Sequence, residues 1–241
     1  AMVAVRLSDV APDDKATRVT YGLLNLTHRD SDEEPEPLVP GRRYRVTVQL
    51  NDVAQSFPAG HRLRVSVSTS YWPLAWPAPE PVQLTIHGGT SRFILPVRRP
   101  QDLDGRLRGF DQPEGAEPLT TGMGRPEEHR WTVIRDLAED VSTLEVINDE
   151  GVYRIDEIDL DMERRTNEWY TFADDDFGSP RGETYCVRGL SRGDWSVRTI
   201  TRTILTCDSG HFYLRAELDA YEGDVRVFSE NWSATIPRDL V

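Results

Sequence analysis

Cysteine and lysine are nearly absent from this chain of 241 residues, which has two cysteines, Cys186 and Cys207, and a single lysine, Lys15. Two cysteines are too few for the disulfide framework of a small secreted domain. Neither has the cysteine or histidine neighbours that a zinc site requires. We therefore expect two free thiols in a reducing compartment and a cytoplasmic location.

Long apolar runs and basic stretches are also missing. No segment approaches the roughly 18–20 consecutive apolar residues that span a bilayer. Acidic residues outnumber basic ones by 41 to 28, which gives a formal net charge of −13. A chain of this charge repels the phosphate backbone of nucleic acids, and no basic patch interleaved with aromatic residues offsets the repulsion. We expect a soluble protein whose partners include neither nucleic acid nor a membrane.

Metal-binding motifs are the third absence. The five histidines occur singly, without H-E-x-x-H or H-x-H spacing. Two groups of carboxylates could still supply oxygen ligands to calcium, namely residues 174–176 and the set Asp156, Glu157, Asp159 and Asp161. Neither group has the spacing of a calcium-binding loop, and alternating carboxylates are typical of the solvent-facing side of a strand. We expect no metal and no cofactor, with calcium at these loops as the alternative.

Short segments with alternating polarity are what the sequence does contain. In residues 62–68, Leu63, Val65 and Val67 alternate with arginine and serine, so the aliphatic side chains share one face of a strand. The same pattern begins at Val3 and recurs at residues 17–26, 44–50, 82–87, 92–97, 130–135, 143–148, 152–160, 168–172, 183–188, 195–205, 211–218 and 225–232. Turn residues separate these segments, which predicts an all-β, mostly antiparallel sandwich or barrel.

Two further features bear on the organisation of the chain. Residues 98–128 are rich in proline and glycine, which predicts a long irregular excursion over the surface. The alternation starts at the second residue without a lead-in segment, so we expect further sequence upstream. We predict a single domain over residues 1–241.

One short motif is typical of hydrolases. Residues 189–193 read G-L-S-R-G and match the G-x-S-x-G nucleophile elbow, in which a strand turns sharply into a helix and lifts the serine above a sheet. Here the following residues, starting at Asp194, have the pattern of a second strand. The glycines therefore predict a hairpin turn, and Ser191 is not expected to be catalytic.

An aromatic, proline-rich loop follows the strand at residues 62–68. Tyr71, Trp72 and Trp76 lie among four prolines, which cannot extend a strand ladder. Three large aromatic side chains in six residues need a cover. They are consistent with packing in the core of the domain, with an interface to another domain, or with a platform for stacking sugars.

Several segments resemble one known family. Residues 24–29 (LNLTHR), 57–64 (FPAGHRLR) and 218–224 (LDAYEGD), together with 236–239 (IPRD), are similar to the C-terminal domain of the CocE/NonD family of bacterial serine hydrolases. That family includes acyl esterases and X-Pro dipeptidyl-peptidases. The resemblance extends over nearly the whole chain, and it implies a jelly-roll, galactose-binding-like β-sandwich that packs against an α/β-hydrolase catalytic domain.

The resemblance also implies what this chain does not do. The serine, aspartate and histidine of the family's triad belong to the hydrolase domain, and no position here matches their motifs. We therefore expect a noncatalytic accessory domain that helps to shape the substrate cleft of a parent hydrolase. The alternatives are a carbohydrate-binding module that uses Trp72 and Trp76, and an independent enzyme with an unrecognised site. If the aromatic loop is uncovered, self-association into a homo-oligomer is also expected.

Overall fold

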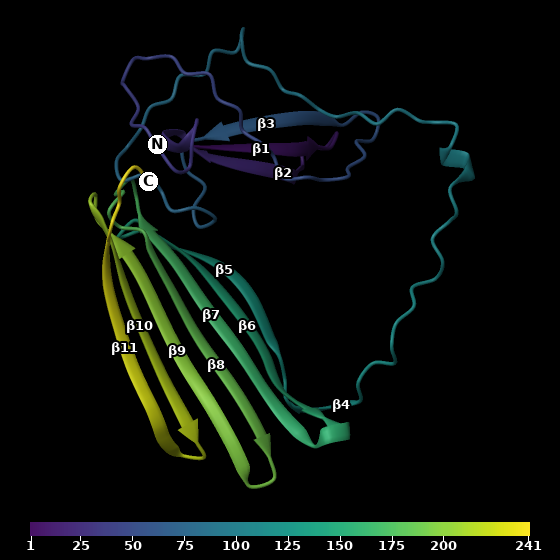
Figure 1. The fold of residues 1–241 in the computed structure, drawn as a ribbon, viewed down its shortest axis with the longest axis vertical. Helices are drawn as coiled ribbons and strands as arrows, with labels where there is room; N and C mark the ends of the chain where they lie inside the picture. Colours follow the sequence, from purple (N-terminus) through teal and green to yellow (C-terminus); the bar gives the residue numbers. More distant parts are fainter.

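The computed structural model describes residues 1–241 as two separate antiparallel sheets, without an α-helix (Figure 1). The first sheet has three strands in the order β2-β1-β3, and it is formed by β1 (Met2–Val10), β2 (Ala16–Asn25) and β3 (Arg62–Ser68). Three short 3-10 helices, η1 (Leu26–His28), η2 (Asp104–Arg106) and η3 (Asp156–Ile158), complete the regular structure outside the second sheet. The all-β, antiparallel fold predicted from the alternation is confirmed.

The second sheet is a meander of eight strands. Its order is β11-β10-β9-β8-β7-β6-β4, and β5 pairs with β6 as well. The strands are β4 (Thr121–Arg125), β5 (Glu128–Asp136), β6 (Val141–Ile155), β7 (Leu160–Ala173), β8 (Arg181–Arg192), β9 (Trp195–Cys207), β10 (His211–Glu222) and β11 (Val225–Pro237). From β5 onward each strand pairs with the next along the chain, as the predicted hairpins require.

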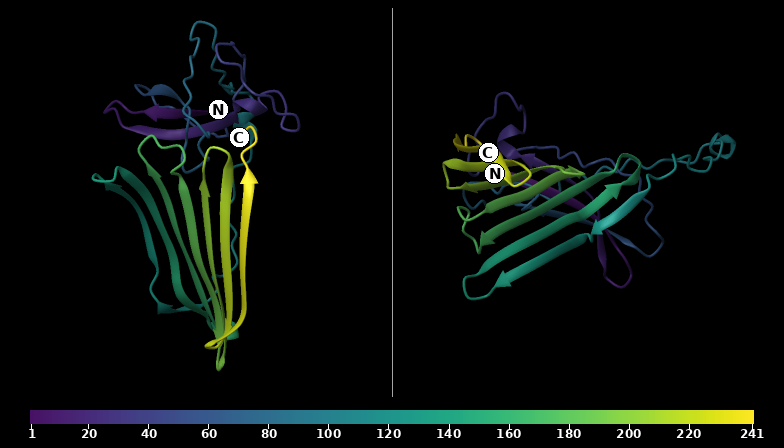
Figure 2. Two further views of the ribbon diagram at one scale, coloured as in Figure 1. Left: turned by 90° about the vertical axis from the view of Figure 1, so that its left-hand side faces the viewer. Right: turned by 90° about the horizontal axis from the view of Figure 1, so that it is seen from below.

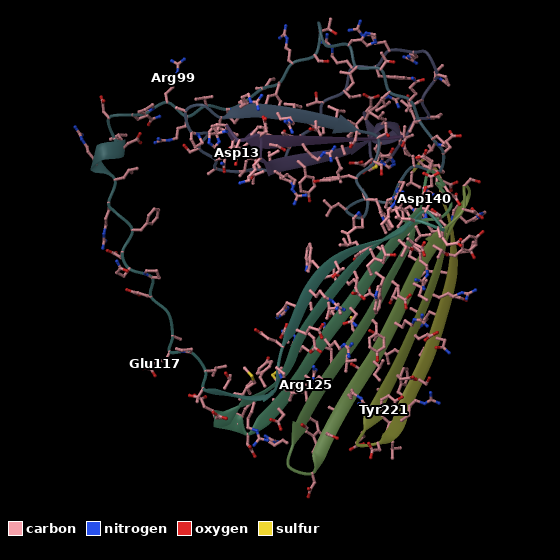
Figure 3. All side chains as sticks on the ribbon, turned by 180° about the vertical axis from the view of Figure 1, so that it is seen from behind. Asp13, Arg99, Glu117, Arg125, Asp140 and Tyr221 are labelled. Atoms are coloured by element: carbon pink, nitrogen blue, oxygen red, sulfur yellow. The ribbon has the colours of Figure 1, made fainter.

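The two sheets meet at one end of the larger one. Figure 2 shows that the three-stranded sheet lies across the end of the eight-stranded sheet, with its strands running across the long strands below. Asp140 lies at this end, and Tyr221 and Arg125 lie at the far end (Figure 3). Residues 98–120 contain only η2 and lead along the outside to the far end, where β4 begins.

The eight-stranded sheet has two chemically different faces, because side chains alternate along each strand. One face, here called the apolar face, contains a cross-strand row of aliphatic and aromatic residues from six strands. Its members are Val133, Leu144, Tyr170, Leu205, Leu214 and Ala234. The opposite face has ion pairs such as Arg130–Glu145 and Arg202–Glu183. The next row of the apolar face is mixed, because Glu168, Thr184 and Thr203 lie between Trp131 and Trp232. The face is therefore apolar mainly at the end where the two sheets meet.

Three segments expected to be strands are not strands in the structure. Residues 44–50, 82–87 and 92–97 form no ladder. Residues 49–51 approach β2 only through isolated contacts, such as the bond from the Asn51 amide to the Tyr21 carbonyl at 2.9 Å. Gly22 permits this approach, since a Cβ there would lie 2.1 Å from the Gln49 carbonyl oxygen. Polar and apolar residues do alternate in these segments, but no neighbouring strand is available to pair with them.

One strand occurs where an irregular excursion was expected. β4 lies within residues 98–128 and pairs with the end of β6. Its sequence is TGMGR, and glycine has low strand propensity, so composition alone gave no strand signal. Gly124 lets the two backbones approach, because a Cβ there would lie 3.1 Å from the Val152 carbonyl oxygen.

The buried core is small for a chain of this length. Only 21 of 241 residues are buried, and the chain exposes 17669 Å². A compact monomer of this length exposes about 11,000 Å². The excess lies on the extended residues 98–120 and on the faces of both sheets, where Leu63, Val65 and Val67 of β3 are exposed. Both sheets therefore present apolar surface that this chain does not cover.

Candidate functional site

The aromatic loop, residues 70–80, lies at the junction of the two sheets. Trp72 and Trp76 contact each other edge to face, with ring centroids 4.8 Å apart. Trp72 also contacts Tyr170 of β7 at 5.9 Å, and Trp76 contacts Phe212 of β10 at 5.6 Å. Edge-to-face contacts at these distances are favourable for aromatic rings. Both tryptophans therefore pack on the upper part of the apolar face.

Polar contacts fix the loop as well. The Trp76 indole Nε1 donates to the Cys207 thiol Sγ at 3.1 Å. The Arg238 guanidinium donates through Nη2 to the Pro77 carbonyl at 2.5 Å and through Nη1 to the Asp208 carbonyl at 2.9 Å. It lies over the Phe212 ring at 4.6 Å. Arg238 therefore connects the loop to the end of β11 and to the β9–β10 turn.

Burial lowers the hydration of the Arg238 guanidinium. Only 6% of this residue is exposed, and its Nε has no hydrogen-bond partner. Loss of hydration lowers the pKa of the Arg238 guanidinium from its ordinary value. The carbonyl oxygens and the Phe212 ring stabilise the charge in place of water.

The two ends of the chain meet beside this loop. The Asn25 side chain accepts a bond from the Thr27 amide, which caps η1, and donates to the Leu240 carbonyl at 2.9 Å. The Leu26 amide donates to the Ala1 carbonyl at 2.8 Å. A cavity of about 170 Å³ lies between these groups and Trp76. It is lined mostly by apolar residues, so it belongs to the packing of the junction.

Tyr71 points to the three-stranded sheet instead. Its hydroxyl accepts a hydrogen bond from Arg18 Nη1 at 2.6 Å, and its ring packs edge to face on Tyr21 at 5.5 Å. The Arg6 guanidinium lies over the Tyr71 ring at 5.0 Å. The hydrogen bond to Tyr71 raises the pKa of Arg18. The three aromatic residues singled out from the sequence are thus close together, but Tyr71 packs on the three-stranded sheet and the two tryptophans pack on the eight-stranded sheet.

A second concave region adjoins Tyr71 and was missed by the sequence reasoning. It is an open depression of about 560 Å³ on one face of the three-stranded sheet, and it is lined by Arg6, Ser8, Ala16, Arg18, Arg64, Ser66 and Tyr71. The arginines come from β1, β2 and β3. Alternation within each strand predicts on which face of that strand each arginine lies. The three arginines come together only through the register between the strands, which the alternation does not reveal.

Ser191 does not lie on a nucleophile elbow. It is in β8, opposite Ser196 of β9, and the chain turns between them at Gly193, whose φ is 56°. A strand follows the turn, so no helix N-terminus faces the serine. The hairpin interpretation is confirmed, and the hydrolase motif is a coincidence of turn residues.

Two of the acidic residues singled out from the sequence, Asp159 and Asp161, share one arginine partner. Arg154 donates to Asp159 at 2.9 Å and to Asp161 at 2.7 and 2.8 Å. These bonds lower the pKa of Asp161. No group of three or more histidine, cysteine or acidic side chains lies close enough to hold a metal ion. Asp159 and Asp161 therefore form ion pairs with Arg154 at the surface of the sheet.

A known protein family matches the N-terminal half of the chain. The model of the X-Pro dipeptidyl-peptidase C-terminal non-catalytic domain matches residues 1–121. The chain belongs to this family. The match ends where β4 begins, so the eight-stranded sheet and the segments at 218–224 and 236–239 lie outside the matched residues. The resemblance seen at residues 24–29 and 57–64 is the part that the family model covers.

One curated relative supports the same family. Cocaine esterase of Rhodococcus sp. (strain MB1 Bresler) is 31% identical over 68 residues, which is 28% of this chain and 12% of the relative. The aligned region is therefore a small part of that enzyme. No solved structure matches the chain, so the jelly-roll, galactose-binding-like description stays a prediction. No helix in the structure is long and apolar enough to cross a membrane.

Proposed function

We propose that this chain is a noncatalytic accessory region of a CocE/NonD-like serine hydrolase, of the acyl esterase or X-Pro dipeptidyl-peptidase type. In this role it packs on the α/β-hydrolase domain and helps to shape the substrate cleft. Membership of the non-catalytic domain family supports the proposal. So does the position of Ser191 in a plain hairpin.

The observation that carries the proposal is the uncovered apolar face of the eight-stranded sheet. The aromatic loop covers its upper part, but Trp131 and Val133 of β5 remain 78% and 75% exposed. Trp232 lies in the same cross-strand row as Trp131 at the opposite edge of the sheet and is also exposed. Trp131 and Val133 lie two residues apart on one face of β5, and large exposed apolar side chains grouped in this way mark interaction surfaces. A catalytic domain seated on this face would bury them.

The aromatic loop is the part best placed to contribute to a cleft. It is held on both sides, by Tyr71 on the three-stranded sheet and by the two tryptophans on the larger one. A rigid loop positions a neighbouring surface more precisely than a mobile one. The use of Tyr71, Trp72 and Trp76 as an interdomain surface stays part of the proposal.

The first experiment tests the noncatalytic role. The purified chain is assayed on nitrophenyl acyl esters and X-Pro anilides, and it is incubated with a serine-reactive phosphonate probe. We expect no turnover above buffer and no labelling. Either labelling or turnover would show that the chain has its own reactive serine.

A second experiment tests the docking surface. A separately produced CocE/NonD hydrolase domain is mixed with the chain, and the complex is followed by sedimentation velocity. We expect Val133→Ser to weaken the complex at least tenfold. Ile134→Ser is the matched control, because Ile134 is the next residue of β5, is 50% exposed and lies on the opposite face. Equal weakening by both variants, or no complex with the unmodified chain, would contradict the proposal.

The carbohydrate-binding alternative has less support in the geometry. Sugar stacking needs an open ring face, and Trp72 and Trp76 are half-buried against each other and against the large sheet. Saturable quenching of tryptophan fluorescence by a glycan, lost in Trp72→Ala, would favour that alternative. The cytoplasmic location also remains a proposal, and it rests on the two free thiols of Cys186 and Cys207.

A further inference from the structure

Three arginines surround one serine on a single face of the three-stranded sheet. Ser8 of β1 lies opposite Arg18 of β2 and opposite Arg64 of β3. Arg6 lies two residues away on β1, on the same face, and is opposite Ser66 of β3. Neighbouring strands are about 4.8 Å apart, so the backbones of Arg18 and Arg64, on either side of Ser8, are about 10 Å apart. All three guanidinium groups line the open depression next to Tyr71.

None of these three arginines forms an ion pair in a chain with 41 acidic residues. Arg6 donates to the Ser68 hydroxyl at 3.3 Å, and its Nε is buried without a hydrogen-bond partner. Arg18 donates to the Tyr71 hydroxyl. By contrast, Arg62, which precedes Arg64 on the same face of β3, pairs with Asp14. Like charges that share a depression repel each other, so an anion bound among them is stabilised.

The polar groups around the depression fit an oxyanion. The guanidinium groups can only donate hydrogen bonds, and the hydroxyls of Ser8 and Ser66 can add further donors. The planar fork of arginine matches the two oxygens of a carboxylate. The depression is open and shallow, which suits a small ligand at the surface.

We propose that Arg6, Arg18 and Arg64 form a binding site for a small organic dicarboxylate. Two carboxylates suit the site because Arg18 and Arg64 extend from the strands on either side of Ser8, whose backbones are about 10 Å apart, and Arg6 adds a third positive charge. A single carboxylate would leave two guanidinium groups without a counter-charge. This site does not depend on the proposed accessory role.

The test uses the whole 241-residue chain and titrates it with succinate, acetate and inorganic phosphate at equal ionic strength. Binding is followed by calorimetry and by the arginine Nε–H signals in NMR spectra. We expect succinate to bind at least tenfold more tightly than acetate and more tightly than phosphate. The Nε–H signals that shift should be lost in Arg6→Gln, Arg18→Gln and Arg64→Gln.

A matched variant separates a site from general attraction. Arg62→Gln removes the same charge from the same strand face but not from the depression, so it should change succinate affinity less than twofold. Arg18→Gln and Arg64→Gln should each weaken it at least tenfold. Equal loss in Arg62→Gln, tighter binding of phosphate than succinate, or no binding of succinate would overturn the proposal. Circular dichroism of each variant checks that the sheets are intact.

Discussion

At the scale of single residues, the best-defined polar group is Asp149 in β6. It is 3% exposed and accepts two hydrogen bonds from Arg125, at 2.6 and 2.9 Å. The Gly151 amide donates to the same carboxylate at 2.8 Å. Gly151 has φ of 72°, and a Cβ there would lie 2.1 Å from the Arg125 carbonyl oxygen. The register of β6 against β7 shifts between Asp149 and Val152, and the Arg125–Asp149 bonds join β4 to β6 at this irregularity.

Asp149→Asn is predicted to lower the free energy of unfolding by about 1–3 kcal/mol, because a neutral amide cannot accept both bonds of the Arg125 fork. Urea denaturation measures the change. Asp161→Asn is the control, since Asp161 forms a more exposed pair with Arg154, and solvent screens exposed pairs so that they contribute little to stability. Equal effects of the two substitutions would show that burial of Asp149 does not increase the contribution of its pair with Arg125 to the free energy of unfolding.

The same carboxylate predicts a pH dependence. The Arg125 hydrogen bonds hold the pKa of Asp149 below its ordinary value, so the folded chain binds fewer protons than the unfolded chain near pH 4. The contribution of Asp149 is therefore fully present above about pH 4 and is lost as the pH falls further. The difference between the unfolding midpoints of the unmodified chain and of Asp149→Asn should stay constant from pH 6 to about pH 4 and shrink as the pH falls below about 4. Parallel curves would exclude this linkage.

Asp208 gives a second residue-scale prediction. The Tyr213 hydroxyl and the amides of Gly210 and His211 donate to its carboxylate and lower its pKa to about 2. In Tyr213→Phe the pKa should rise toward the ordinary value of about 3.9, as measured by NMR titration of the Asp208 carboxyl carbon. Tyr221→Phe, at the far end of the sheet (Figure 3), should leave it unchanged. A pKa near 4 in the unmodified chain would refute the assigned bonds.

At the scale of elements, the aromatic loop determines how the two sheets are joined. Trp76→Ala removes the contacts with Trp72 and Phe212 and the bond to Cys207. Truncating a half-buried tryptophan should cost about 2–3 kcal/mol, somewhat less than the 3–5 kcal/mol found in full cores. Hydrogen exchange in residues 70–80 should become faster, while exchange at the far ends of β8 and β9, around Gly193, is unchanged.

Trp131→Ala is the control for the loop, because Trp131 is mostly exposed and lies away from the junction. It should change the unfolding free energy by less than about 0.5 kcal/mol. If exchange in the loop were no faster in Trp76→Ala than in Trp131→Ala, the loop would be held by Arg238 and Tyr71 alone.

Local signals explain which elements could be predicted from the sequence. The hairpins from β7 to β11 depend on alternation and on turn residues such as Gly193 and Gly223, both of which have positive φ. The alternation and the turn residues lie within a few residues of each other in the sequence, so they can be recognised without the structure. β4 was missed because its glycines act through close approach to Val152, which is distant in sequence. Residues 44–50 were overpredicted, since alternation does not reveal whether a partner strand is available.

The candidate sites show the same difference between features that are local in the sequence and contacts between residues distant in the sequence. Tyr71, Trp72 and Trp76 were found because large aromatic residues cluster within one segment. Arg238 and its contact with Pro77 were missed, since the two residues are 161 positions apart. The depression was missed because Arg6 and Arg64 meet only through the register of β1 with β3.

At the scale of the whole molecule, exposed surface is the dominant property. The chain exposes far more area than a compact monomer, and the uncovered parts include the apolar faces of both sheets. The proposed hydrolase partner accounts for this surface. In its absence, copies of the chain are expected to associate through the same faces, which would appear as a concentration-dependent sedimentation coefficient.

The tie between Asn25 and Leu240 has a consequence for synthesis, because it spans 215 positions. At about 5–20 residues per second, a nascent β2 waits roughly 10–40 s before Leu240 has been made. The meander from β5 to β11 closes hairpin by hairpin during this interval. The junction between the two sheets therefore closes only after the meander has been synthesised, and until then β1 and β2 lack the contact that Leu240 supplies.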